Sequence, residues 1–172
     1  MKNKKLSPLI LFIIGSLMHF LYDLSGKNTI VGLIAPVNES VWEHTKMVLL
    51  PVICWWTFYY IIKRKQYKIN KNKWFTGALV ALLTSIISIP VLHYFYTQSF
   101  GVELLVVDII ILFLALLFGQ LLGLHFTKHS KGINSNIVIL IFVAIIITYI
   151  IFTLYPPRIP LFRDSMTGKY GI

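Results

Sequence analysis

The sequence predicts an all-α protein, a polytopic membrane bundle of five transmembrane helices with its N-terminus inside and its C-terminus outside. Its 172 residues are 57% hydrophobic and only 13% charged, which is far too apolar for a soluble domain of this size. Five apolar stretches reach or approach the length that crosses ~30 Å of hydrocarbon. Most basic residues lie in the short loops between these stretches, as topology determinants do.

A single transmembrane domain is expected to fill residues 1–172. The first span follows a basic segment, but no small-residue cleavage site comes after it, so a retained anchor is expected. The apolar part of the second span, 47–62, would make a helix of only ~24 Å, so this helix should begin earlier. Asn38 or Ser40 can cap it, and Ser40 and Glu43 have the spacing of a capping box. The five expected spans cover 6–24, 39–62, 74–96, 102–126 and 137–155.

The C-terminal tail, 156–172, has prolines at 156, 157 and 160, which exclude a regular helix at its start. Leu161 and Phe162 give the tail an apolar part, and Asp164 gives it a charged part. Two interpretations stay open. The tail folds back over the outer mouth of the bundle as a lid, or it is a mobile extracellular end.

The basic residues predict the orientation of the bundle. Eleven of the sixteen lie in the N-terminal segment, the 63–73 loop and the 127–136 loop, which fall on one side of the membrane. The positive-inside rule puts that side in the cytoplasm. All six acidic residues then fall at the outer side, where an outward-facing polar site is the simplest explanation for them.

The net charge of +10 does not predict a nucleic-acid partner, because no basic helix or sheet is interleaved with aromatic side chains. Cys54 is the only cysteine, which excludes an intrachain disulfide. Its place in an apolar span favours a packed side chain over a reactive thiol. The sequence also lacks the motifs of P-loop enzymes, serine hydrolases and zincin proteases.

The stretch 36–46 is the most informative segment, because it places several titratable groups directly before an apolar span. Glu39, Glu43 and Lys46 share one helix face, and His44 lies on the adjacent face. We expect Glu43, or else Glu39, to act as a general base, and Lys46 to contact a substrate headgroup. Glu43 is preferred because it lies one turn deeper and adjoins His44. The alternative is a helix start that simply favours acidic side chains.

Three further residues are expected to join His44 in binding a divalent metal such as zinc. His19 and Asp23 are spaced i, i+4 in the first span, which would put both on one helix face. The alternative is a structural pair that fills the bundle interior. Asp108 lies roughly two turns inside the fourth span, so its carboxylate needs a partner. The candidate partners of Asp108 are His19, His44, Lys46 and His93.

A competing pair, His125 and His129, also has the spacing of helical metal ligands. It lies at the cytoplasmic end of the fourth span, beside Lys128 and Lys131, with no acidic residue nearby. A solvated helix end is therefore the favoured interpretation of this pair.

Three segments carry a likeness to other proteins: 19–23, the block Asn38-Glu-Ser-Val-Trp-Glu-His-Thr-Lys46, and the ending 160–172. Together they resemble a family of small multi-pass bacterial membrane proteins that is known only as a domain of unknown function. The resemblance implies a protein of the bacterial cytoplasmic membrane, and it implies no activity. The polar cluster is also similar in chemistry to intramembrane hydrolases of the alkaline-ceramidase type, which hold zinc near one membrane face but have two more spans.

Three hypotheses about function follow, and all place membrane lipid around the protein. The first is a metal-dependent enzyme acting on a lipid or lipid-linked substrate. The second is a non-catalytic carrier or binding protein for a cation or small solute, and the third is a structural assembly partner. An open metal position would favour the first, and a water-lined path to the cytoplasm the second. Complete pairing of the polar groups without a cavity would favour the third.

The predicted orientation is testable by cysteine labelling in a Cys54→Ala background. A Ser165→Cys variant should react from outside with a membrane-impermeant maleimide in intact cells. A Ser130→Cys variant should react only after the cells are opened, because its loop belongs to the basic, cytoplasmic side. Labelling of the second variant but not the first in intact cells would reverse the orientation.

Overall fold

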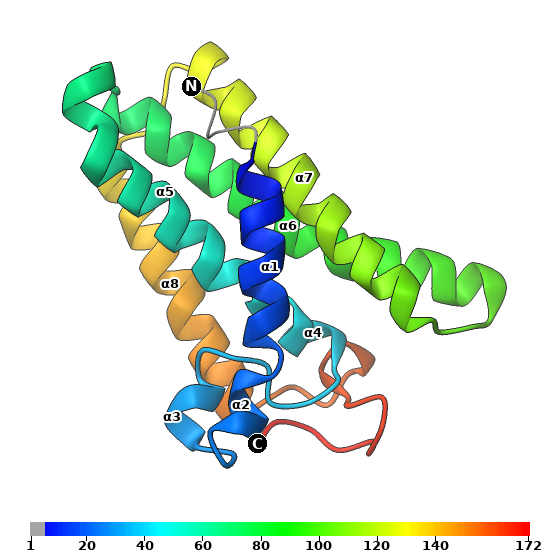
Figure 1. Cartoon of the computed structure of the whole chain (residues 1–172). Helices are drawn as coiled ribbons and strands as arrows, with labels where there is room; N and C mark the ends of the chain where they lie inside the picture. Colours follow the sequence, from blue (N-terminus) through cyan, green and yellow to red (C-terminus); the bar gives the residue numbers. More distant parts are fainter. Residues whose placement is uncertain (1–5) are drawn as a thin grey trace.

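The computed structural model describes residues 6–172, and in that range it contains helices and loops but no strand. The all-α class is therefore confirmed. Lys2, Lys4 and Lys5, which contribute to the predicted orientation, lie outside the described residues. Figure 1 shows a bundle of long helices that run between two ends of the molecule. The bundle helices are α1 (Ser7–Met18), α5 (Lys46–Tyr67), α6 (Lys71–Phe100), α7 (Leu105–His129) and α8 (Ser135–Leu154).

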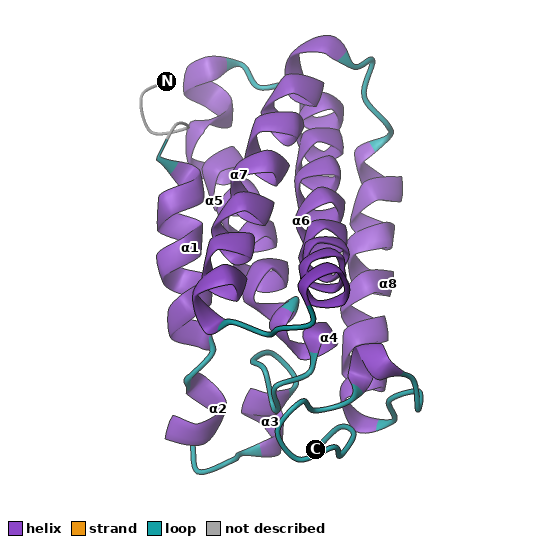
Figure 2. Ribbon diagram, turned by 90° about the vertical axis from the view of Figure 1, so that its right-hand side faces the viewer, coloured by secondary structure: helices purple, strands orange, loops and turns teal. Residues whose placement is uncertain are grey.

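One end of the bundle carries all of the short elements and the C-terminus (Figure 2). We call it the loop end. At the opposite end α1 begins, and the chain turns from α5 to α6 and from α7 to α8. The short elements are α2 (Leu21–Leu24), α3 (Thr29–Gly32), α4 (Val41–His44) and the 3-10 helix η2 (Pro160–Phe162).

Four helical segments are long and apolar enough to cross a membrane: Val41–Tyr67, which joins α4 to α5, and α6, α7 and α8. The most apolar window, in α8, has a mean hydropathy of 3.2, yet only 22% of it is buried inside the protein. An apolar helix surface of this kind is compatible with contact to lipid.

The first predicted span differs from the expected continuous helix. α1 has 12 residues, a length of ~18 Å, and the chain turns at His19 and Phe20 before α2 resumes. This length falls short of the ~30 Å of hydrocarbon in a bilayer. The fifth crossing therefore stays a prediction. The early end of α1 matters for function, because it leaves His19 at the C-terminal cap of the helix.

Small residues allow α6 and α7 to pack closely. A Cβ atom added at Gly119 would lie 2.6 Å from the carbonyl oxygen of Ala81, and one at Gly123 would lie 2.5 Å from that of Gly77. Within α6, the Ser85 hydroxyl lies 2.9 Å from the carbonyl of Ala81. Backbone approach over small residues is the usual way for membrane helices to gain van der Waals contact.

The predicted helix start at Ser40 is confirmed, but only half of the capping box forms. The Ser40 hydroxyl accepts a hydrogen bond from the backbone N–H of Glu43, 3.3 Å away. The Glu43 side chain does not return to the N–H of Ser40, which instead donates to the side chain of Asn38. The Glu43 carboxylate points into the protein and accepts from the backbone N–H of Val37 at 3.0 Å.

A buried ion pair between Glu43 and Lys46 joins the parts of the loop end. The two side chains are 3% and 0% exposed, and Lys46 Nζ lies 2.6 Å from Glu43 Oε2. Lys46 Nζ also donates to the carbonyl of Gly32 at 2.7 Å and contacts that of Ala35 at 3.4 Å. The other Glu43 oxygen accepts from the hydroxyl of Thr153 in α8. The pair thus ties the 32–37 loop and the start of the second span to α8.

Breaking this pair from one side should destabilise the protein strongly. We expect Lys46→Met to lower the unfolding midpoint in detergent by roughly 10 °C, because an unpaired buried carboxylate costs ~3–5 kcal/mol. The Glu43→Gln/Lys46→Met double variant should recover part of this loss, since it leaves no uncompensated charge. Lys169→Met, at an exposed lysine of the tail, is the matched control. A Lys46→Met protein as stable as this control would contradict the anchoring role.

Candidate functional site

A cavity of about 840 Å³ opens at the loop end of the bundle. Its wall combines apolar side chains from the long helices, such as Phe12, Met47 and Leu112, with polar side chains at the helix ends. The polar side chains include two groups, each of which brings three metal-ligating residues together: His19, Glu39 and His44, and His93, Glu103 and Asp108.

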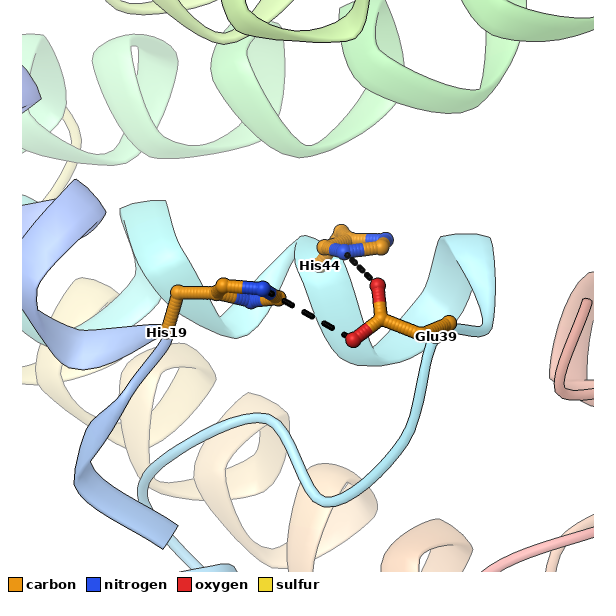
Figure 3. A group of neighbouring side chains, drawn as sticks. All are labelled: His19, Glu39 and His44. Carbon is orange, nitrogen blue, oxygen red and sulfur yellow. Dashed lines mark ion pairs between the residues drawn. The ribbon is translucent and has the colours of Figure 1, made fainter. Parts of the chain in front are cut away.

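The first group places two imidazoles on one carboxylate, as Figure 3 shows. His44 Nε2 lies 3.2 Å from Glu39 Oε2, and His19 Nε2 lies 3.6 Å from Glu39 Oε1. The two rings are stacked, with centroids 5.4 Å apart and planes 26° apart. One ligand atom from each residue lies within 4.8 Å of the others, so a single ion can contact all three.

Each member of this group sits where a helix begins or ends. His19 caps the C-terminus of α1, and His44 is the last residue of α4. Glu39 lies in the turn before α4, where the Ser165 hydroxyl of the tail donates to its backbone carbonyl at 3.2 Å. The hydrogen bond with His44 holds the pKa of Glu39 below its usual range, although burial acts in the opposite direction. Glu39 is therefore held as a carboxylate between two imidazoles.

His19 has one nitrogen whose hydrogen-bonding capacity the protein does not use. Its Nδ1 atom is buried and has no hydrogen-bond partner among the residues that the structure describes. A buried polar atom without a partner is rare in native proteins, and it is typical of functional sites or sites of unseen water or ions. The packing of the chain therefore positions the His19 imidazole without a hydrogen bond at Nδ1 from the described residues.

The second group comes from the ends of α6 and α7 and the turn between them. His93 Nδ1 lies 2.9 Å from Asp108 Oδ1. Tyr96 donates its hydroxyl to the same carboxylate, with its oxygen 3.1 Å from each oxygen of Asp108. The backbone N–H of Leu104 donates to the Tyr96 oxygen at 3.1 Å. One ligand atom each from Glu103, His93 and Asp108 lies within 4.8 Å of the others.

The structure brings together some of the predicted site residues and separates others. His19, His44 and Asp108 line the cavity, and of the four candidate partners of Asp108 it is His93 that contacts it. Asp23 is exposed on α2 and is not among the lining residues. The reason is that α1 ends at Met18, so His19 and Asp23 do not share one face of a continuous helix. Glu39 lines the cavity, whereas Glu43 and Lys46 do not.

Tyr96 and Glu103 are two residues of the second group and its surroundings that were not predicted from the sequence. Tyr96 follows His93 at i, i+3, a spacing that places both side chains on one helix face. Glu103 lies in the short turn between two spans, where an acidic residue by itself carries little information.

The tail also contributes to the cavity, because Arg163, Asp164 and Tyr170 are among its lining residues. Phe162 packs on Trp42, with ring centroids 4.8 Å apart. Burial raises the pKa of Asp164, but hydrogen bonds from Thr167 and from backbone N–H groups outweigh burial and hold it below its usual range. Of the two interpretations of the tail, the structure shows the one in which it folds against the cavity.

The competing histidine pair lies away from this site. The rings of His125 and His129 stack with centroids 4.3 Å apart at the C-terminal end of α7, and both residues are exposed. Neither belongs to a group of three metal-ligating residues within the part of the chain that the structure describes.

Comparison with known proteins gives a family but no activity. No curated protein and no solved structure matches the chain. One family model matches residues 2–172, so the resemblance to a family of unknown function is confirmed over nearly the whole length. The chain belongs to DUF6512, a family of unknown function.

Proposed function

We propose that this protein is a metal-dependent membrane enzyme that acts on a lipid or lipid-linked substrate, with zinc bound by His19, Glu39 and His44. One observation carries the proposal. Two imidazole nitrogens and a carboxylate converge at the wall of a cavity whose lining is part apolar and part polar. Two histidines with one glutamate form a ligand set of catalytic zinc sites, in which the fourth position stays open.

The distances support this ligand set. Two ligands ~2.0–2.1 Å from a tetrahedral zinc lie ~3.3 Å apart. The two nitrogen–oxygen separations in the first group, 3.2 Å and 3.6 Å, are close to that value. Small side-chain rotations would bring all three atoms to a common ion. The metal would supply an activated water and a Lewis acid at the open position.

The cavity wall supports an amphipathic substrate. Phe20 and Leu105, which line it, have 58% and 74% of their surfaces exposed. Such apolar surface at the edge of a cavity suits an acyl or prenyl chain, while the histidines and carboxylates suit a polar headgroup. We place the site at the outer face of the bacterial cytoplasmic membrane, with the N-terminus inside, following the distribution of basic residues.

The other two hypotheses have less support. A carrier needs a path through the bundle, but no residue of the 63–73 or 127–136 loops is among those that line the cavity. In a scaffold, the polar groups would be completely paired and no cavity would lie beside them. Glu43 and Lys46 fit that description, so we assign them a structural role. No other residue takes over the catalytic roles expected for Glu43 and Lys46. Glu39 is assigned to the metal.

Metal binding is the direct test of the proposal. Full-length protein purified in detergent should contain zinc, and chelation followed by zinc titration should restore it. His44→Ala and Glu39→Gln should each weaken binding at this site at least ~10-fold, because each removes one of three ligands. His125→Ala, at an exposed histidine of the opposite end, is the matched control and should bind as the wild type does.

Two results would contradict the assignment. The first is wild-type protein that binds no zinc after chelation and titration. The second is a His44→Ala or Glu39→Gln variant that keeps the same number of sites and the same affinity. Unfolding midpoints measured on all variants would show whether a loss of metal reflects a loss of fold.

A further inference from the structure

We propose that the same cavity holds a second divalent cation, bound by His93, Glu103 and Asp108. This site is separate from the zinc site above, since the two share no ligand. The three residues lie at the C-terminal part of α6, in the turn, and in the first turn of α7. A turn of only four residues, 101–104, separates the two helices and brings these side chains together.

Hydrogen bonds from neighbouring residues hold the second group in place, as they do in known metal sites. Tyr96 is buried, with 8% of its surface exposed, and its hydroxyl bonds to both oxygens of Asp108. Leu104 in turn holds Tyr96 through its backbone N–H. Ligating carboxylates are usually fixed by such outer hydrogen bonds. Asp108 Oδ1 contacts both His93 Nδ1 and the Tyr96 hydroxyl, whereas Oδ2 contacts the Tyr96 hydroxyl alone. Each carboxylate oxygen has two lone-pair sites, so Oδ2 keeps acceptor capacity for a cation.

The charges in the cavity favour a second cation. Four carboxylates line it, and Arg163 is the one guanidinium or ammonium group among the lining residues. A divalent ion at the first group would contact only Glu39 among these carboxylates and would still leave the negative charges of the lining one in excess. Uncompensated charge is costly beside a low-dielectric bilayer. A second divalent ion would lie beside Glu103 and Asp108, the two carboxylates of the second group that the first ion does not contact.

The donor atoms distinguish the two sites. The first group offers two imidazole nitrogens and one carboxylate, whereas the second offers one imidazole nitrogen and two carboxylates. Carboxylates suit harder ions such as Mn²⁺, and imidazoles suit zinc. Zinc is therefore expected to fill both sites, and Mn²⁺ to favour the second site relative to the first.

The stoichiometry of metal binding tests the second site. Full-length protein, stripped with a chelator and titrated with Zn²⁺ in detergent, should bind two equivalents by elemental analysis. Glu103→Gln should bind one, and so should His44→Ala, because each removes a ligand from a different site. Glu103 is exposed, so its variant should keep the wild-type unfolding midpoint. Tyr96→Phe keeps every ligand and should weaken one of the two sites by ~10–100-fold.

The outcomes separate this proposal from the proposed function. If the wild type binds one equivalent and only His44→Ala loses it, the second site does not exist and the zinc site stands. If the wild type binds one equivalent and only Glu103→Gln loses it, the second site stands and the zinc site fails. If the wild type binds none, both fail. A His125→Ala variant with fewer equivalents than the wild type would show that the count includes surface binding, which would also overturn the second site.

Discussion

The loop end of this protein depends on one buried ion pair, Glu43 with Lys46. Removing two charges from water is costly, and the cost is offset only when every donor and acceptor finds a partner. Here the ammonium group has the carboxylate and the carbonyls of Gly32 and Ala35, and the carboxylate also has Val37 and Thr153. The pair therefore fixes the path of the chain on both sides of Glu43, and so the places of Glu39 and His44.

The same constraint explains why the polar site lies at one end of the bundle. Within the spans, unpaired polar groups are expensive, so titratable residues gather where helices end and loops can supply partners. His19, Glu39 and His44 each occupy such a position. The tail completes the arrangement, because Phe162 packs on Trp42 and Ser165 bonds to the backbone of Glu39. The site is thus assembled from segments that are distant in the sequence.

Hydropathy predicts the long helices, because an apolar run of sufficient length has few alternatives in a membrane. The Ser40 cap was also predictable, since it depends on residues three apart. The pairing of His19 with Asp23 was not, because it assumed a helix that in fact ends at Met18. Contacts such as Lys46 to the carbonyl of Gly32, or His93 to Asp108, depend on how loops return, which no local spacing encodes.

Glu39 and Glu43 show why position in the sequence cannot assign a role to a carboxylate. Both lie beside the same helix start, and the sequence favours the deeper one for chemistry. Depth has the opposite effect, because a buried carboxylate must be paired, and the Glu43 carboxylate is engaged by Lys46, Val37 and Thr153 and does not line the cavity. Glu39 keeps 43% of its side chain exposed, and among the described residues its carboxylate pairs with two imidazoles that line the cavity. The exposed carboxylate is therefore the one available to bind a ligand, and the buried one is the support that positions it.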